Sequence, residues 1–385
     1  FLFQVLYIYR YIYDSKYLNL IVTAIVIVCT IVYLQVQIVG GLLVMRIATE
    51  GMISWYVGGV VFFSILVIYL WAGGLRAVAW TDIFYGVLIV ITILSSGFFL
   101  IKTAGGVETV FETLVERDPA NVSMVGPEGN NRTAMWLSLF FIVPIGAFMG
   151  PQMWIRNYAS SSEKNFLILP WLLCLSSIIC LGTLFSGSAG VVMAENVTNP
   201  DSILLQLTVE YAHPFFYALI IVGIYATIFS TANSQVHALS AVYTIDVHKR
   251  YINKSAPDRK LVSIAKWAVL FISIISYILI LISPQSIFDL AIMAMGGMAQ
   301  LFIPVLGALF WKRSTAKAAI TGLLMGEVVF FTGVFMSVAD SSICAISGML
   351  INLFFFVIVA LVDKPRFTVY KKIETYKKEY SRKDY

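Results

Sequence analysis

Apolar stretches of about 20 residues recur along almost the whole of this 385-residue chain. A stretch of that length crosses about 30 Å of hydrocarbon as an α-helix, whereas a membrane β-barrel is built from short segments of alternating polarity. Hydrophobic residues make up 59% of the chain and charged residues only 12%, which is about half the charged share of soluble domains. These features predict an all-α, polytopic membrane protein.

We expect ten complete membrane spans, preceded by the end of a further helix at residues 1–13. The spans are predicted near residues 18–45, 52–72, 79–102, 135–156, 165–190, 214–248, 261–282, 285–311, 316–337 and 342–362.

Lys and Arg residues gather on one side of the membrane when these spans alternate from a cytoplasmic loop at residues 14–17. On this plan 22 of the 26 basic residues are cytoplasmic and the other 4 are outside. Because basic loops stay in the cytoplasm, we expect a multi-pass protein of the plasma membrane with a cytoplasmic C-terminus. Residues 1–362 are expected to form one transmembrane domain. Residues 363–385 form a basic tail, either an interfacial helix on the anionic inner leaflet or a disordered segment.

Several other functions are disfavoured by the composition. The formal charge of +5 resides in loops and the tail rather than on a soluble face, so no nucleic-acid partner is expected. The four cysteines form no CxxC pair, which argues against a metal site and a disulfide framework. We also find no Ser-His-Asp pattern or metal-ligand cluster, and therefore do not expect an enzyme.

A stripe of hydroxyl groups marks the span near 214–248. Thr227, Ser230, Thr231 and Ser234 follow the i, i+3, i+4, i+7 spacing of one helical face. Such hydroxyls can bond to carbonyls of their own helix or allow close packing of a neighbouring helix. They can also form an oxygen-rich site for a small hard cation such as Na⁺.

The fourth span is irregular, because FIVPIGAFMGPQMWIR places Pro144, Gly146, Gly150 and Pro151 within eight residues. Proline removes a backbone donor and glycine weakens the helix, so this span is expected to be kinked or broken. Non-helical backbone at membrane depth survives where it lines a cavity, and such spans are pointers to a transporter's binding site. A purely structural kink is the alternative.

The other polar residues at membrane depth are few. One of Gln35 and Gln37 must face protein, because residues two apart on a helix point about 200° apart. Glu327 is an intramembrane carboxylate and therefore a functional candidate, although it can also be protonated or paired within the bundle. Asp82 stands at the inner end of the third span. His237 is a candidate proton site or a packed neutral imidazole.

Three stretches together resemble the sodium:solute symporter family. The first is LQVQIVGG at 34–41, followed by GGLRAVAWTD at 73–82. The second is GPQMWIRNYASSSEKN at 150–165, which is similar to the broken helix of that family and the basic loop after it. The third is ATIFSTANSQVHALSAVYTIDVHKRY at 226–251. The resemblance covers residues 14 to about 362.

The resemblance implies the leucine-transporter type of fold, in which two five-helix repeats have inverted topologies. On this plan the first three spans match core helices 3 to 5, the next five match core helices 6 to 10, and the last two are appended. Residues 1–13 would be the end of core helix 2, so core helix 1 is expected to be absent and the fold N-terminally incomplete.

The resemblance also implies an activity, which is symport of Na⁺ and a small organic solute into the cell by alternating access. Na⁺ would be held by the hydroxyls of Ser230 and Thr231 and the carbonyl of Thr227, while Ser234 is expected to pack. Asp82 matches an acidic residue on the inner ion route. The substrate-lining residues are expected to be Gln37, Gly150, Pro151 and Gln152. The PQMWIR run looks closest to the pantothenate, monocarboxylate and proline branches.

Three alternatives stay open. The same fold can couple transport to H⁺ through Glu327, Asp82 or His237. The bundle can also be a symporter-like sensor that does not transport. Finally, the chain can be non-functional if core helix 1 is lacking.

Overall fold

The computed structural model describes residues 9–123, 126, 133–160, 162, 164–194, 199–282 and 286–363, without the side chains of residues 10, 11, 74–77, 158 and 159. The predicted tail from residue 364 onward lies outside the described residues. Helices form throughout the described ranges, and no strand occurs in them. In chain order the elements are η1 (Tyr9–Tyr13), α2 (Lys16–Ala48), α3 (Trp55–Thr103), α4 (Val107–Arg117), η2 (Pro119–Val122), α5 (Thr133–Met149), α6 (Pro151–Ala159), α7 (Lys164–Ser176), α8 (Ile179–Met193), η4 (Pro200–Ser202), α9 (Ile203–Tyr211), α10 (Pro214–Ala241), η5 (Val242–Ile252), α11 (Asp258–Ile282), α12 (Ile287–Gln300), α13 (Phe302–Phe310), α14 (Ala316–Phe335) and α15 (Ser341–Val362).

The number of membrane spans agrees with the prediction. Within the described residues, nine helical segments are long and apolar enough to cross a membrane, and the bent pair α5–α6 makes ten. The pairs α7–α8 and α12–α13 each act as one span, whereas α3 contains two, Trp55–Gly73 and Val78–Thr103.

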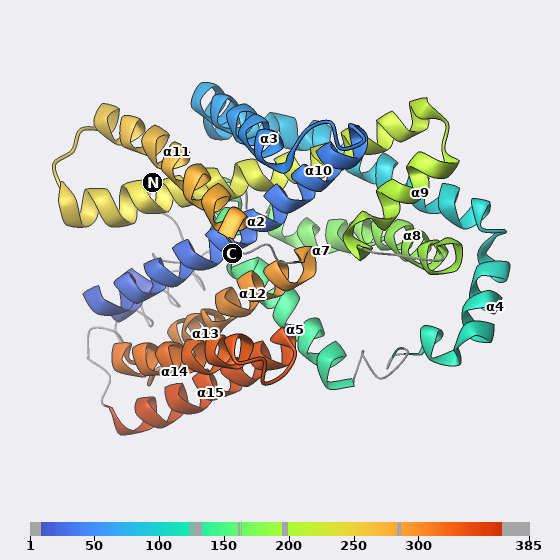
Figure 1. Cartoon of the computed structure of the whole chain (residues 1–385). Helices are drawn as coiled ribbons and strands as arrows, with labels where there is room; N and C mark the ends of the chain where they lie inside the picture. The colour runs from blue at the N-terminus through green and yellow to red at the C-terminus, as the bar shows by residue number, and fades with distance from the viewer. Residues whose placement is uncertain are drawn as a thin grey trace.

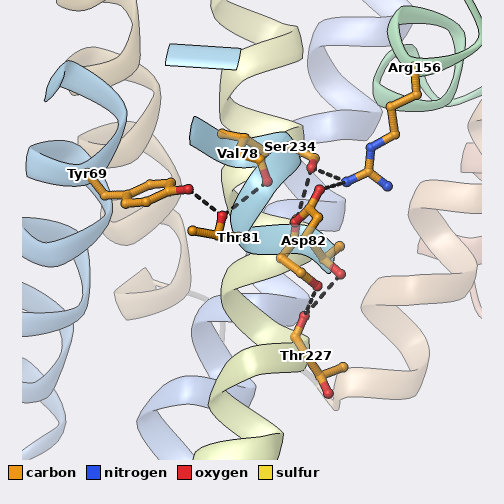
Figure 2. Close-up of polar contacts among 9 residues, drawn as sticks. Tyr69, Val78, Thr81, Asp82, Arg156, Thr227 and Ser234 are labelled. Atoms are coloured by element: carbon orange, nitrogen blue, oxygen red, sulfur yellow. Dashed lines mark hydrogen bonds and ion pairs between the residues drawn. The ribbon is translucent and has the colours of Figure 1, made fainter. Parts of the chain in front are cut away.

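Helix α3 must turn back on itself between its two spans, although its backbone is helical throughout. The hydroxyls of Tyr69 and Thr81 form a hydrogen bond across 12 residues. In a straight helix these residues would be separated by about 18 Å, too far for their side chains to meet. Figure 2 shows them on two neighbouring stretches of ribbon. The turn between the two spans therefore lies between Gly73 and Val78, and it brings Asp82 back into the bundle.

The predicted break in the fourth span lies at Gly150, where α5 and α6 meet at an angle of 60°. Gly150 has an extended conformation (φ −61°, ψ 136°), and Pro151 is the first residue of α6. A residue before proline is driven out of the helical region, whereas proline itself suits the first position of a helix. The Gly-Pro pair therefore ends one helix and starts the next. Pro144 is accommodated inside α5.

Helix α2 runs through the centre of the molecule and contributes to two hydrophobic cores (Figure 1). Its first half, from Leu18 to Cys29, packs in a core with η1, α13 and α14. Its second half, from Leu34 to Val44, packs in a core with α3, α10 and α11. Gln35 and Gln37 are both buried, so both side chains face protein. The helical periodicity alone predicted this for only one of the two.

The C-terminal hairpin α14–α15 packs against α12, close to the point where α12 gives way to α13 (Figure 1). Buried side chains satisfy backbone carbonyls on both sides of this break. Tyr9 donates to the Leu301 carbonyl over 2.6 Å, Tyr13 donates to the Pro304 carbonyl over 2.6 Å, and Asn352 donates to the Gln300 carbonyl over 2.7 Å.

Candidate functional site

The hydroxyl stripe of α10 is bonded to its own helix. Ser230 and Thr231 both donate to the Thr227 carbonyl, over 2.9 and 3.2 Å, and Thr227 donates to the Gly223 carbonyl over 3.0 Å. Ser234 donates to the Ser230 carbonyl over 2.9 Å. A hydroxyl that donates its hydrogen keeps its oxygen lone pairs. Back-bonding therefore leaves the stripe able to accept a hydrogen bond or bind a cation.

The break at Gly150 places α6 against α10. Gly150 and Gln152 are buried, and the Gln152 amide folds over Gly150. A Cβ added to Gly150 would lie only 2.6 Å from the Gln152 Nε2 atom. The Gln152 Oε1 atom is buried without a hydrogen-bond partner. Because an unpaired buried carbonyl is unfavourable, this oxygen is suited to receive a donor from a bound molecule.

Arg156, one turn further along α6, connects three helices (Figure 2). Its Nη2 atom lies 2.5 Å from the Asp82 Oδ2 atom of α3 and 2.5 Å from the Ser234 Oγ atom of α10. The Arg156 side chain is 47% exposed and that of Asp82 is 22% exposed. The second carboxylate oxygen, Oδ1, is buried and has no hydrogen-bond partner. One oxygen of the Asp82 carboxylate is thus paired with a guanidinium, and the other has no hydrogen-bond partner.

Asp82 is held in place by the turn in α3. The neighbouring Thr81 hydroxyl donates to the Val78 carbonyl over 3.0 Å and bonds to the Tyr69 hydroxyl of the preceding span. These bonds fix the first turn after the reversal (Figure 2).

Further polar groups lie on α10 next to the stripe. The Asn233 Oδ1 atom and both polar atoms of the Gln235 side chain are buried without partners. Carboxylate, hydroxyl and amide oxygens are the ligands that hard cations prefer. The arrangement is therefore chemically suited to a small hard cation. The Arg156 guanidinium lies at the Ser234 end of the cluster, which the predicted orientation places toward the cytoplasm.

The structure brings most of the predicted site residues together. Thr227, Ser230 and Thr231 share one face of α10. Asp82 of α3 is joined through Arg156 to Ser234, on the next turn of α10. Helix α6, which begins with Pro151 and Gln152 after Gly150, packs against α10. Gln37 is buried on α2, which also packs against α10. Within the described contacts, no hydrogen bond joins the Gln37 side chain to this cluster.

Two residues of the cluster were not predicted from the sequence. Ser234 was expected to pack, but its hydroxyl accepts a hydrogen bond from Arg156. The sequence pattern gives Arg156 no role beyond its part in the positive charge of the predicted cytoplasmic side. A basic residue one turn after a Gly-Pro break, in a chain with few carboxylates at membrane depth, is the signal that could have identified it.

These features define a polytopic α-helical membrane protein with one broken span beside a polar, cation-suited cluster. Comparison with known proteins gives the family: the model of the sodium:solute symporter family matches residues 6–326. The chain belongs to the sodium:solute symporter family.

Relatives within this family include transporters of two named substrates. The chain is 29% identical to the high-affinity proline transporter PutP of Bacillus subtilis over 309 residues, which cover 72% of this chain and 62% of the relative. It is 28% identical to the sodium/pantothenate symporter of Haemophilus influenzae, over 83% of this chain and 66% of the relative. The chain thus spans under two thirds of the length of these relatives.

A solved structure supports the fold. A Na⁺-coupled sialic acid symporter, solved in a substrate-bound outward-open state, superimposes with a TM-score of 0.77 at 20% sequence identity. The match covers 94% of this chain and 78% of the solved chain. The predicted all-α symporter-type bundle is confirmed.

Proposed function

We propose that this protein is a Na⁺-coupled symporter that carries a small organic solute into the cell by alternating access. The observation that carries the proposal is the position of the α10 hydroxyl stripe, which lies beside both the broken α5–α6 span and the Asp82 carboxylate. Membership of the sodium:solute symporter family supports it, as do relatives named for Na⁺-coupled transport.

The proposed Na⁺ ligands on this chain are the hydroxyls of Ser230 and Thr231 and the carbonyl of Thr227. The Thr227 carbonyl already accepts both hydroxyls in addition to its backbone hydrogen bond within α10. Binding of Na⁺ to this carbonyl therefore requires at least one hydroxyl to rotate away. Such rotation is a local change that can link ion binding to the packing of α10. Asp82 lies on the proposed inner ion route, next to Arg156.

The proposed substrate-lining residues are Gly150, Pro151 and Gln152 at the break, together with Gln37 on α2. The unpaired Gln152 Oε1 atom, which belongs to the amide packed over Gly150, favours a small solute with a hydrogen-bond donor. The relatives named for proline and pantothenate support a small carboxylate-bearing solute as the first class to test.

The coupling follows from differential binding. Na⁺ can shift the conformational equilibrium only by the difference in its affinity between the outward-open and inward-open states. The membrane potential adds about 2.3 kcal/mol per translocated charge for each 100 mV. A single Na⁺ can therefore drive substantial accumulation of a solute.

For the setting of this activity, we infer a multi-pass protein of the cell membrane with a cytoplasmic C-terminus. The distribution of 22 basic residues inside against 4 outside, among 26, supports this orientation. Residues 1–362 are proposed as the transport domain and residues 363–385 as its cytoplasmic tail.

The proposal is tested by uptake into proteoliposomes containing the purified protein. Labelled proline, pantothenate and short monocarboxylates are offered with an inward Na⁺ gradient, and matched vesicles receive choline instead. We expect at least one solute to accumulate only with Na⁺. Accumulation that persists in choline and follows an imposed pH gradient would overturn Na⁺ coupling. Absence of uptake of all three solute classes would overturn the substrate class.

A further inference from the structure

A buried carboxyl group lies outside the cluster just described. Glu327 is located midway along α14, and only 9% of its surface is exposed. Both of its carboxyl oxygens are buried and have no hydrogen-bond partner. Neither the proposed Na⁺ site nor the proposed substrate site uses this residue.

The space for the Glu327 carboxyl is provided by Gly297 on α12. A Cβ added to Gly297 would lie 3.7 Å from the Glu327 Oε2 atom, 2.5 Å from the Cys29 Sγ atom and 3.6 Å from the Phe331 ring. The carboxyl therefore faces a glycine, a thiol and an aromatic edge. These neighbours come from α12, α2 and α14 itself.

No cation is available to pair with this carboxyl among the described residues of the helices packed against α14, which are α2, α12, α13 and α15. The titratable group facing Glu327 is the neutral Cys29 thiol. The charged residues of these four helices lie near helix ends: Lys16, Arg46 and Asp289. On α14 itself, Lys317 is bonded to Asp363, over 3.3 Å, at the inner end of the helix.

Ionisation of Glu327 in this position is strongly unfavourable, because a buried unpaired carboxylate loses its hydration without compensation. Burial without a partner therefore favours the neutral acid.

We propose that Glu327 is a proton-binding site, which holds a proton while α2, α12 and α14 are packed together as in this structure. A metal cation does not suit the site. Hard cations are bound by several oxygen ligands, and the neighbours here are a thiol, a glycine and a ring. A single proton neutralises the carboxylate without any further ligand.

This site lies where α12 leads into the α12–α13 break. If α12 moves away from α14 during a conformational cycle, water reaches Glu327 and the carboxyl releases its proton. Proton binding would then stabilise the packed state, and the pH of the solution that reaches Glu327 would influence the cycle. The proposal does not depend on Na⁺ coupling, because the proton is held by the packing alone.

The direct test is infrared spectroscopy of the purified protein in lipid at pH 7.5, for the wild type and the Glu327→Gln variant. We expect the carbonyl stretch of a protonated carboxylic acid in the wild type and its loss in Glu327→Gln. The matched control is Asp289→Asn, which removes an exposed carboxylate from α12 and should leave the acid band unchanged. A wild-type spectrum without an acid band, or an identical band in Glu327→Gln, would overturn the proposal.

Two further measurements keep the proposal testable if Glu327→Gln does not fold. The Cys29→Ala variant retains Glu327 and should shift the frequency of the acid band, whereas an unshifted band would contradict the assigned location. The folding equilibrium of the wild type should weaken by up to about tenfold per pH unit as the pH rises above about 4.3, because unfolding exposes the carboxyl to water, where it ionises. A flat pH profile would overturn a proton site.

Discussion

Arg156 is a positive charge close to the proposed Na⁺ ligands, and its removal should strengthen Na⁺ binding. The guanidinium lies 2.5 Å from the Ser234 Oγ atom, and Ser234 follows Ser230 by four residues, or about 6 Å along the helix. A Na⁺ ion held by Ser230 and Thr231 would therefore be about 7 Å from this charge.

The magnitude follows from Coulomb's law. Two unit charges about 7 Å apart repel by about 2.4 kcal/mol at an effective dielectric constant of about 20. The Arg156 side chain is 47% exposed, so solvent and salt reduce this repulsion to about 1 kcal/mol. We therefore expect the Arg156→Gln variant to require about fivefold less Na⁺ for half-maximal binding.

The assay is equilibrium binding of radioactive Na⁺ to the purified protein. Arg156→Lys retains the charge and should change the half-saturating Na⁺ concentration by less than about twofold. Asp82→Asn removes the opposing charge and should shift that concentration upward, while the double variant should return close to the wild type. Equal shifts in Arg156→Gln and Arg156→Lys would refute the electrostatic reasoning and indicate a positional role for the guanidinium.

Three other predictions follow from the packing and from the break. Gly146→Ala should destabilise the protein by about 1–3 kcal/mol in thermal unfolding, because the added Cβ would lie 2.1 Å from a backbone oxygen of α12. Gly86→Ala, whose Cβ meets nothing within 4 Å, is its control, and equal changes would contradict the packing argument. Tyr13→Phe should lower stability by about 1 kcal/mol, because its hydroxyl donates to the Pro304 carbonyl of α13, whereas Tyr17→Phe, at an exposed position, should have no effect. Gln152→Ala should raise the half-saturating solute concentration without altering that of Na⁺, and a parallel change in both would argue against a substrate contact.

The spans and the break could be predicted from the sequence because both depend on local properties. Apolar length decides where a helix can cross the membrane, and the Gly150-Pro151 pair ends a helix whatever surrounds it. The turn in α3 was also predictable, although its backbone remains helical and the reversal is evident from the Tyr69–Thr81 hydrogen bond.

The polar cluster could be predicted only in part. Helical spacing places Thr227, Ser230 and Thr231 on one face, but it says nothing about which neighbouring helix faces them. The contact of Arg156 with Asp82 joins residues 74 positions apart, and such pairing depends on the angle at Gly150. The roles of Gln37, Gln152 and Asp82 in binding stay predictions, as does the division between the transport domain and the tail.

The central claim, that the α10 hydroxyl stripe binds Na⁺, is tested most directly by Na⁺ binding to the Ser230→Ala/Thr231→Ala double variant. Ser240→Ala is the matched control, because Ser240 lies on the same helix and donates to the His237 carbonyl over 2.8 Å in the same back-bonded manner. We predict that the double variant needs about tenfold or more Na⁺ for half-saturation, since hydrogen bonds and ligand contacts to charged groups contribute about 1.5–3 kcal/mol, while Ser240→Ala binds as the wild type. Equal shifts in the two variants, or no shift in the double variant, would contradict the claim.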